Sequence, residues 1–198
     1  MFFQKEVETM SREKIREIQL ERLKYTVKYC YDHVPFYKKK LDDAGVSPDQ
    51  IKSLDDIRRI PPTTKADLRD NYPFGLFAVP MRDIVRIHAS SGTTGKPTVV
   101  GYTKHDLDMW SDCMARLCTA AGATADDIVQ ISFGYGMFTG ALGLHYGLEK
   151  LGCTVVPNSS GNTEKAVVAY RSKGSSGRKI PCRFYKRSER ASYQTRCR

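Results

Sequence analysis

The stretch between Ile84 and Tyr102 constrains the fold more than any other part of the chain. Two runs rich in β-branched residues flank a loop of small hydroxylated residues, two glycines and one lysine, and this pattern predicts a loop between two strands. Glycines let the backbone approach a ligand, while hydroxyl, amide and ammonium donors favour phosphate. The residues expected to bind phosphate are Ser90, Ser91, Gly92, Thr93, Thr94, Gly95 and Lys96.

The loop differs from a Walker loop. A Walker loop follows the pattern G-x-x-x-x-G-K-[ST] and opens a helix. Here only Thr93 and Thr94 separate the glycines, Pro97 follows the lysine, and the next residues favour a strand. An ordinary surface turn is the alternative, but a turn needs only one or two residues of this kind. The sequence therefore favours a phosphate loop of another class.

Helices are predicted on both sides of this loop. Ser11 is expected to cap a helix that ends at Pro35, and Thr103 a helix that ends at Gly122. Thr64 and Asp67 have the spacing of a capping box, as do Ser53 with Asp56 and Thr103 with Asp106. Such acids accept backbone N–H groups, so their spacing does not indicate acid/base catalysis.

A βαβ unit is predicted after the second helix. Residues 128–133 and 153–157 favour buried strands, and residues 141–151 between them favour a helix. Strands joined in this way run parallel, with a right-handed crossover. We therefore expect an α/β fold.

The loop after the first of these strands is the second candidate for ligand binding, because ligands collect at the carboxyl ends of parallel strands. Residues 134–140 hold three glycines together with the aromatic residues Tyr135 and Phe138. Aromatic side chains on such a loop suit a flat apolar ligand. The alternative is that both rings simply pack beneath the loop.

Charge and cysteine content limit the class of protein. Residues 1–165 hold 22 Lys and Arg against 21 Asp and Glu, so the net charge of +10 belongs almost entirely to the remainder. The six cysteines form no C-x-x-C pair, which disfavours a zinc site. Without an apolar leader or a long apolar run, we expect a cytoplasmic protein that does not contact a membrane.

Five segments are distinctive when taken together: Thr-Thr-Lys-Ala-Asp-Leu-Arg (63–69), Asn-Tyr-Pro-Phe-Gly-Leu-Phe-Ala-Val-Pro (71–80), Ser-Ser-Gly-Thr-Thr-Gly-Lys-Pro (90–97), Phe-Gly-Tyr-Gly-Met-Phe-Thr-Gly (133–140) and Leu-His-Tyr-Gly (144–147). They resemble the phenylacetate-CoA ligases, which are adenylate-forming acyl-CoA synthetases. The resemblance is nearly unbroken from Arg12 to Lys165. It implies that residues 1–165 are part of an AMP-binding N-terminal domain with a helical start and a mixed or parallel sheet.

The resemblance also implies a function. Such enzymes activate an aryl acid with ATP and Mg²⁺ to an acyl-adenylate, and then transfer the acyl group to coenzyme A. Residues 90–96 would hold the ATP phosphates, and Tyr135, Phe138 and Gly140 would border the aryl pocket. A homodimer is expected. No residue matches the family's catalytic lysine, so no catalytic residue is assigned, and we expect this chain to be inactive alone.

Residues 166–198 do not share the resemblance. They hold ten Lys and Arg against one acid and are poor in Leu, Ile and Phe, a composition typical of disordered segments. The abrupt change at Ala166 favours a shifted reading frame. The alternative is a non-catalytic binding protein whose basic tail contacts nucleic acid through cations and aromatic rings. We disfavour nucleic acid as a partner because no nucleic-acid-binding fold precedes the tail.

Overall fold

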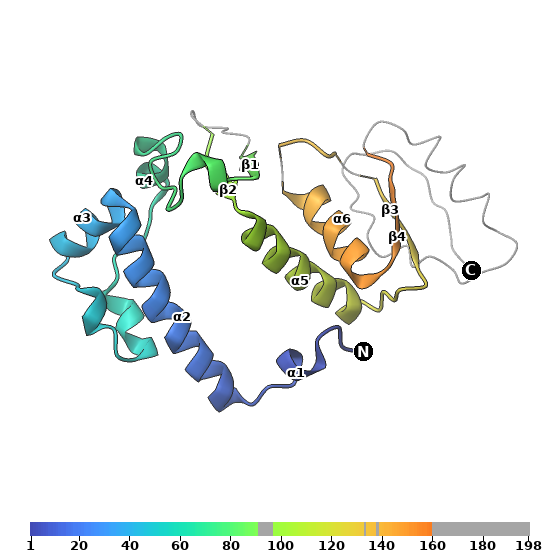
Figure 1. Ribbon diagram of the computed structural model, residues 1–198, viewed down its shortest axis with the longest axis horizontal. Coiled ribbons are helices and arrows are strands. Elements are labelled where there is room, and N and C mark those ends of the chain that lie inside the picture. Colours follow the sequence, from blue (N-terminus) through green and yellow to red (C-terminus); the bar gives the residue numbers. More distant parts are fainter. Residues whose placement is uncertain (91–96, 133, 138, 160–198) are drawn as a thin grey trace, which may run out of the picture.

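The computed structural model describes residues 1–90, 97–132, 134–137 and 139–159, and Figure 1 shows their arrangement. A helical region at the N-terminus leads through a two-stranded ribbon into a unit of helices and parallel strands. The elements in chain order are α1 (Lys5–Glu8), α2 (Arg12–His33), α3 (Pro35–Asp43), η1 (Pro48–Gln50), η2 (Leu54–Arg59), α4 (Lys65–Asp70), η3 (Met81–Asp83), β1 (Arg86–Ala89), β2 (Val99–Tyr102), α5 (Lys104–Ala120), β3 (Ile128–Ile131), α6 (Gly140–Leu151) and β4 (Thr154–Pro157).

The long helix α2 begins and ends where the sequence predicts. The Ser11 hydroxyl accepts a hydrogen bond from the Lys14 N–H, which satisfies one of the free donors of the first turn. The helix ends before Pro35, which instead occupies the first turn of α3. The two helices and the turns after them share a small apolar core made of Val27, Leu41, Val46 and Ile51.

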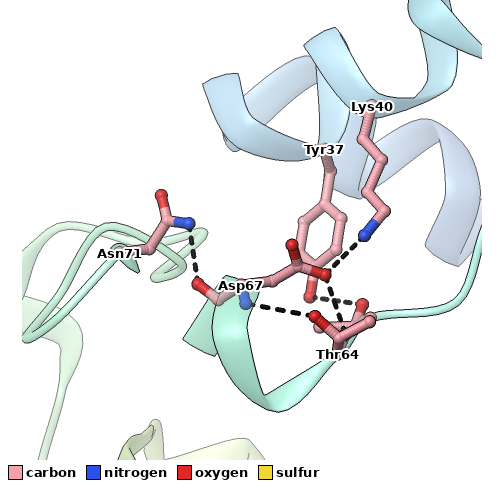
Figure 2. A network of polar contacts seen from close by, with 6 residues as sticks. Tyr37, Lys40, Thr64, Asp67 and Asn71 are labelled. Carbon is pink, nitrogen blue, oxygen red and sulfur yellow. Dashed lines mark hydrogen bonds and ion pairs between the residues drawn. The ribbon is translucent and has the colours of Figure 1, made fainter. Parts of the chain in front are cut away.

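A polar network joins α3 to α4 (Figure 2). The predicted capping box is confirmed, because Asp67 accepts from the Thr64 N–H at 2.7 Å and donates its own N–H to the Thr64 hydroxyl at 3.2 Å. The same carboxylate forms an ion pair with Lys40, which reaches it from α3. Asn71 donates to the Asp67 carbonyl at 2.8 Å. One acid thus fixes a helix start, a neighbouring helix and the following loop.

The strands β1 and β2 form an antiparallel ribbon with His88 opposite Val100 and Ile87 opposite Gly101. Gly101 is required by a close approach, because a Cβ atom at this position would lie 2.7 Å from the ring of Phe77. Ile87 and Gly101 lie opposite each other and share one face of the ribbon. His88, the next residue along β1, therefore lies on the other face. There its ring meets Trp110 of α5 edge-on. The ribbon therefore lies between the N-terminal region and α5.

In the C-terminal unit, α6 packs against α5 and also against β3 and β4. The capping box of Thr103 and Asp106 is confirmed, and β3 and β4 pair in parallel as predicted. Both strands are shorter than predicted: β3 ends at Ile131 rather than at residue 133, and β4 begins at Thr154 rather than at residue 153. The buried side chains of this unit are Cys118, Ala123, Ile131, Ala141, Leu148 and Cys153.

The helices α5 and α6 approach closely because glycines face bulky residues. A Cβ atom on Gly143 would lie 2.5 Å from the Trp110 ring, and one on Gly147 would lie 2.3 Å from the Met114 Cβ. Among the described residues the strands form two separate two-stranded sheets, one antiparallel and one parallel, rather than one mixed sheet. No helix in the described part of the chain is long and apolar enough to cross a membrane.

Candidate functional site

The neck of the predicted phosphate loop is closed by two hydrogen bonds. The Ser90 N–H donates to the Thr98 carbonyl at 2.9 Å, and the Thr98 N–H donates to the Ser90 hydroxyl oxygen at 3.0 Å. These bonds extend the ribbon one step beyond Ala89 and Val99, the last paired residues. The Ser90 oxygen is used as an acceptor here, but its O–H remains a donor that can turn toward a ligand.

Of the predicted phosphate-binding residues, the structure describes Ser90 alone. Its side chain is exposed at the end of β1, where a ligand has access to it. The others, Ser91, Gly92, Thr93, Thr94, Gly95 and Lys96, lie outside the described residues.

The predicted aryl loop is hydrogen-bonded to the strand that leads into the phosphate loop. The Met137 carbonyl accepts from the Ala89 N–H at 3.1 Å and from Nδ1 of His88 at 2.9 Å. A carbonyl oxygen has no proton to donate, so Nδ1 carries the hydrogen. The predicted aryl loop is therefore joined at one carbonyl oxygen to the strand that precedes the predicted phosphate loop.

Tyr135 lies at the inner side of this loop. Its ring packs against the buried cluster of the C-terminal unit, and its hydroxyl lies 3.0 Å from Nδ1 of His145. Nε2 of the same histidine lies 3.0 Å from a carboxylate oxygen of Glu149, one turn further along α6. Burial raises the pKa of the Tyr135 hydroxyl, and the nearby Glu149 carboxylate adds to the effect.

The other two residues of the predicted aryl pocket are less well defined. Gly140 is the first residue of α6 and is exposed. Phe138 lies outside the described residues. The Tyr135 ring packs against the C-terminal cluster, and the contact with His145 gives its hydroxyl a defined partner as well.

His88 is the residue of the site that the sequence prediction missed. Its side chain is only 3% exposed, and its ring meets those of Tyr102 and Trp110 edge-on. Among the described residues, no donor or acceptor reaches its Nε2. The available signal was a histidine between Ile87 and Ala89 in a predicted strand, two residues before the phosphate loop.

Arg86 lies on the same face of β1 as His88. The Arg86 guanidinium lies over the ring of Tyr146 on α6, with its central carbon 4.7 Å from the ring centroid. The described residues contain no group of three His, Cys, Asp or Glu side chains that could hold a metal ion.

Solved structures similar to this chain are acyl-CoA ligases. One is a crystal structure of 2-hydroxyisobutyryl-CoA ligase with the 2-HIB-AMP intermediate and CoA; it has a TM-score of 0.78, is 30% identical and covers 86% of this chain. A second, an open conformation of the same enzyme, has a TM-score of 0.75 at 29% identity and covers 83%. The chain spans 37% and 39% of these two proteins, respectively. Its fold is that of the adenylate-forming CoA ligases, as predicted.

Curated relatives indicate which kind of acyl-CoA ligase the chain is similar to. Phenylacetate-coenzyme A ligase of Aromatoleum evansii is 58% identical over 161 residues, which is 81% of this chain. The proteins of the same name from Escherichia coli (strain K12) and Thermus thermophilus are each 57% identical, over 80% and 85% of the chain. Over most of its length the chain thus matches the phenylacetate-CoA ligases, as the sequence predicts. It spans 36% to 38% of the length of these relatives.

No protein-family model matches the sequence. The relatives and solved structures lend no support to the nucleic-acid alternative. The basic segment on which that alternative depends, residues 166–198, lies outside the described residues.

Proposed function

We propose that residues 90–96 bind the phosphates of ATP and that Tyr135, Phe138 and Gly140 border the pocket for an aryl acid, phenylacetate or a close analogue. The enzyme to which this region belongs forms the acyl-adenylate and then the CoA thioester. This region, residues 1–165, supplies part of the AMP-binding domain. The relatives' name, phenylacetate-coenzyme A ligase, supports this activity. The chain spans 37% and 36% of the length of two of these relatives.

One observation carries the proposal: the strand entering the phosphate loop is hydrogen-bonded to the loop that holds Tyr135, through the Met137 carbonyl. Adenylation requires a carboxylate and a triphosphate to meet within bonding distance, and holding two reactants in place supplies much of the rate enhancement. Donors that directly follow β1 and an aromatic ring on the segment bonded to β1 would provide one position for each reactant.

The chemistry assigns a role to the cation of the loop. A carboxylate oxygen attacks the α-phosphorus of ATP, a new P–O bond forms, and the bond to the β-phosphate breaks with release of pyrophosphate. Both reactants are anions, so Lys96 and the hydroxyl and amide donors favour the reaction by stabilising charge on the phosphates. In the second step the CoA sulfur attacks the acyl carbon, and AMP leaves.

Three parts of the proposal concern the surroundings of the site. The Mg²⁺ ion comes with the nucleotide, because magnesium is commonly held by substrate phosphates and few protein ligands, and the described residues offer no cluster for it. We also propose a homodimer and a cytoplasmic location. No catalytic step is assigned to the metal.

Binding measurements on the chain test the assignments. By calorimetry, Lys96→Ala should weaken binding of a non-hydrolysable ATP analogue by about tenfold or more, because a charge-assisted hydrogen bond contributes about 1.5–3 kcal/mol. Lys104→Ala is the matched control, since that side chain is 84% exposed on α5. If the Lys96→Ala variant and the unaltered chain bind the ATP analogue equally well, the loop is an ordinary turn and not a phosphate-binding loop.

Substrate class is tested in a ligase of the relatives' full length that carries this region. Pyrophosphate release should require ATP and phenylacetate, and butyrate should replace phenylacetate poorly, because a short alkyl chain fills an aryl pocket incompletely. Release that is as fast with butyrate would contradict the assignment of an aryl pocket.

A further inference from the structure

The Met137 carbonyl forms a clamp with β1, and three residues define it: His88, Ala89 and Met137. The oxygen accepts from a side chain at 2.9 Å and from a backbone N–H at 3.1 Å. Ala89 directly precedes Ser90, whose N–H and hydroxyl oxygen close the neck of the phosphate loop. His88 and Ala89 thus bond to the predicted aryl loop, and the next residue, Ser90, closes the neck of the predicted phosphate loop.

The geometry leaves the His88 ring one orientation. The ring is 3% exposed, and its centroid lies 5.6 Å from that of Tyr102 and 6.0 Å from that of Trp110. Nδ1 must carry the hydrogen because its partner is a carbonyl. Breaking this bond would leave the Nδ1–H of the buried His88 without its partner, which is costly away from water. A displacement of Met137 is therefore opposed by β1, and a displacement of β1 by Met137.

We infer that the clamp couples the two ligands: binding at the phosphate loop strengthens binding of the aryl acid, and the reverse holds by the same factor. His88 is then a positioning residue, which contacts neither ligand and acts through the Met137 carbonyl. This inference rests on the proposed function, because it assumes that the neck at Ser90 and the loop at Tyr135 serve different ligands.

The chain contains its own reporter for the test. Trp110 is the only tryptophan, and its ring stacks on Tyr102 with 5.4 Å between centroids while meeting His88 edge-on. Trp110 fluorescence, checked by calorimetry, should follow titration of the 198-residue chain with phenylacetate. The titration is run without nucleotide and again with a saturating non-hydrolysable ATP analogue. The expected result is phenylacetate affinity at least about fivefold higher with the analogue.

Two substitutions separate positioning from general packing. His88→Leu fills the space without a donor and should abolish the coupling. In His88→Asn the amide nitrogen can occupy the place of Nδ1, so part of the coupling should return. The matched control is His105→Leu on the exposed first turn of α5, which should leave the coupling unchanged. Circular dichroism establishes that each variant is folded.

Hydrogen exchange of the unaltered chain gives a second measurement if His88→Leu does not fold. The ATP analogue alone should slow exchange in a peptide that contains residues 134–137. Independent binding of the two ligands, coupling that survives in folded His88→Leu, or unchanged exchange at 134–137 would each overturn the inference and leave the proposed function intact. Failure of both ligands to bind would overturn the proposed function, and the inference with it.

Discussion

The hydroxyl oxygen of Tyr135 lies 3.0 Å from Nδ1 of His145, whose other ring nitrogen lies 3.0 Å from Glu149. The Tyr135 hydroxyl, the His145 ring and the Glu149 carboxylate thus form a continuous line of polar contacts from the loop along α6. Because these contacts occupy the hydroxyl, we expect the Tyr135 ring to be the part of the side chain that contacts an aryl acid in the proposed pocket.

Substitutions at Tyr135 should separate its ring from its hydroxyl. Tyr135→Phe removes one hydrogen bond and should lower the free energy of unfolding by about 0.5–1.5 kcal/mol, with phenylacetate affinity nearly unchanged. Tyr135→Ala also removes the ring and should weaken phenylacetate binding by about tenfold or more, since an aromatic side chain contributes large contact area. Urea denaturation and calorimetry measure the two effects.

Tyr25→Ala is the control for this pair, because Tyr25 is exposed on α2, outside the candidate site. If both substitutions at Tyr135 weaken binding equally, the hydroxyl rather than the ring makes the decisive contact. If neither weakens it, Tyr135 packs beneath the loop and does not border the pocket.

Gly147 should not tolerate a side chain. A Cβ atom there would lie 2.3 Å from the Met114 Cβ and 3.0 Å from its backbone carbon, so α5 and α6 would have to separate. We expect Gly147→Ala to lower the free energy of unfolding by about 1–3 kcal/mol, which shifts Tm by about 2–4 °C per kcal/mol in a chain of this size. Gly136→Ala is the matched control, because a Cβ there meets nothing within 4 Å. Equal melting temperatures for the two variants would contradict the close packing.

Asp67 should make the stability of the fold depend on pH in the acid range. The hydrogen bond from Lys40 holds the pKa of the Asp67 carboxyl below its usual value, and hydrogen bonds from Thr64 act in the same direction. A carboxyl whose pKa is lower in the folded state stabilises the fold at pH values above its unfolded pKa of about 3.9. That contribution is lost as the pH falls through the folded value.

Thermal unfolding between about pH 7 and pH 2 tests this prediction. Asp67→Asn should melt at a lower temperature than the unaltered chain near neutral pH, and the two curves should converge in acid. Asp55→Asn is the control, because the Asp55 side chain is 81% exposed and its ion pair with Arg58 is long, at 3.8 Å. A constant difference between Asp67→Asn and the unaltered chain at all pH values would show that the charge on Asp67 is not what stabilises the network.

Cysteine reactivity should follow burial. Burial raises the pKa of the Cys118 thiol to about 11, with a smaller contribution from Cys153, and burial also raises the pKa of Cys153. The thiolate is the reactive form. At about pH 8 we expect iodoacetamide to label Cys118 about 100-fold or more slowly than the exposed Cys113, as measured site by site by mass spectrometry. Labelling in urea, where the rates should converge, is the control; equal rates in the native chain would mean that the unit opens readily.

The features that the sequence predicts well depend on residues that lie close together along the chain. A cap needs only a hydroxyl and an acid three residues later, so Thr64 and Thr103 could be placed from sequence alone. The parallel pairing of β3 with β4 follows from two short apolar runs joined by a helix. The strand ends were predicted less well, because apolar character continues past the last paired residue.

The contacts that define the site could not be predicted in this way. His88 meets the Met137 carbonyl across 49 residues, and Lys40 meets Asp67 across 27. No local period specifies such pairs; they depend on how the ribbon and helices pack. The division into two sheets was missed for the same reason, since strand runs indicate strands but not their neighbours in space.

The bonded pair of Ser90 and Thr98 has a consequence for binding energy. Bringing the ends of a flexible segment together costs conformational entropy, which rises with the logarithm of the segment's length. Here strand pairing holds those ends together before any ligand arrives, so folding has already met that entropic cost. If residues 90–96 bind a nucleotide as proposed, the nucleotide therefore does not have to bring the two ends of this segment together.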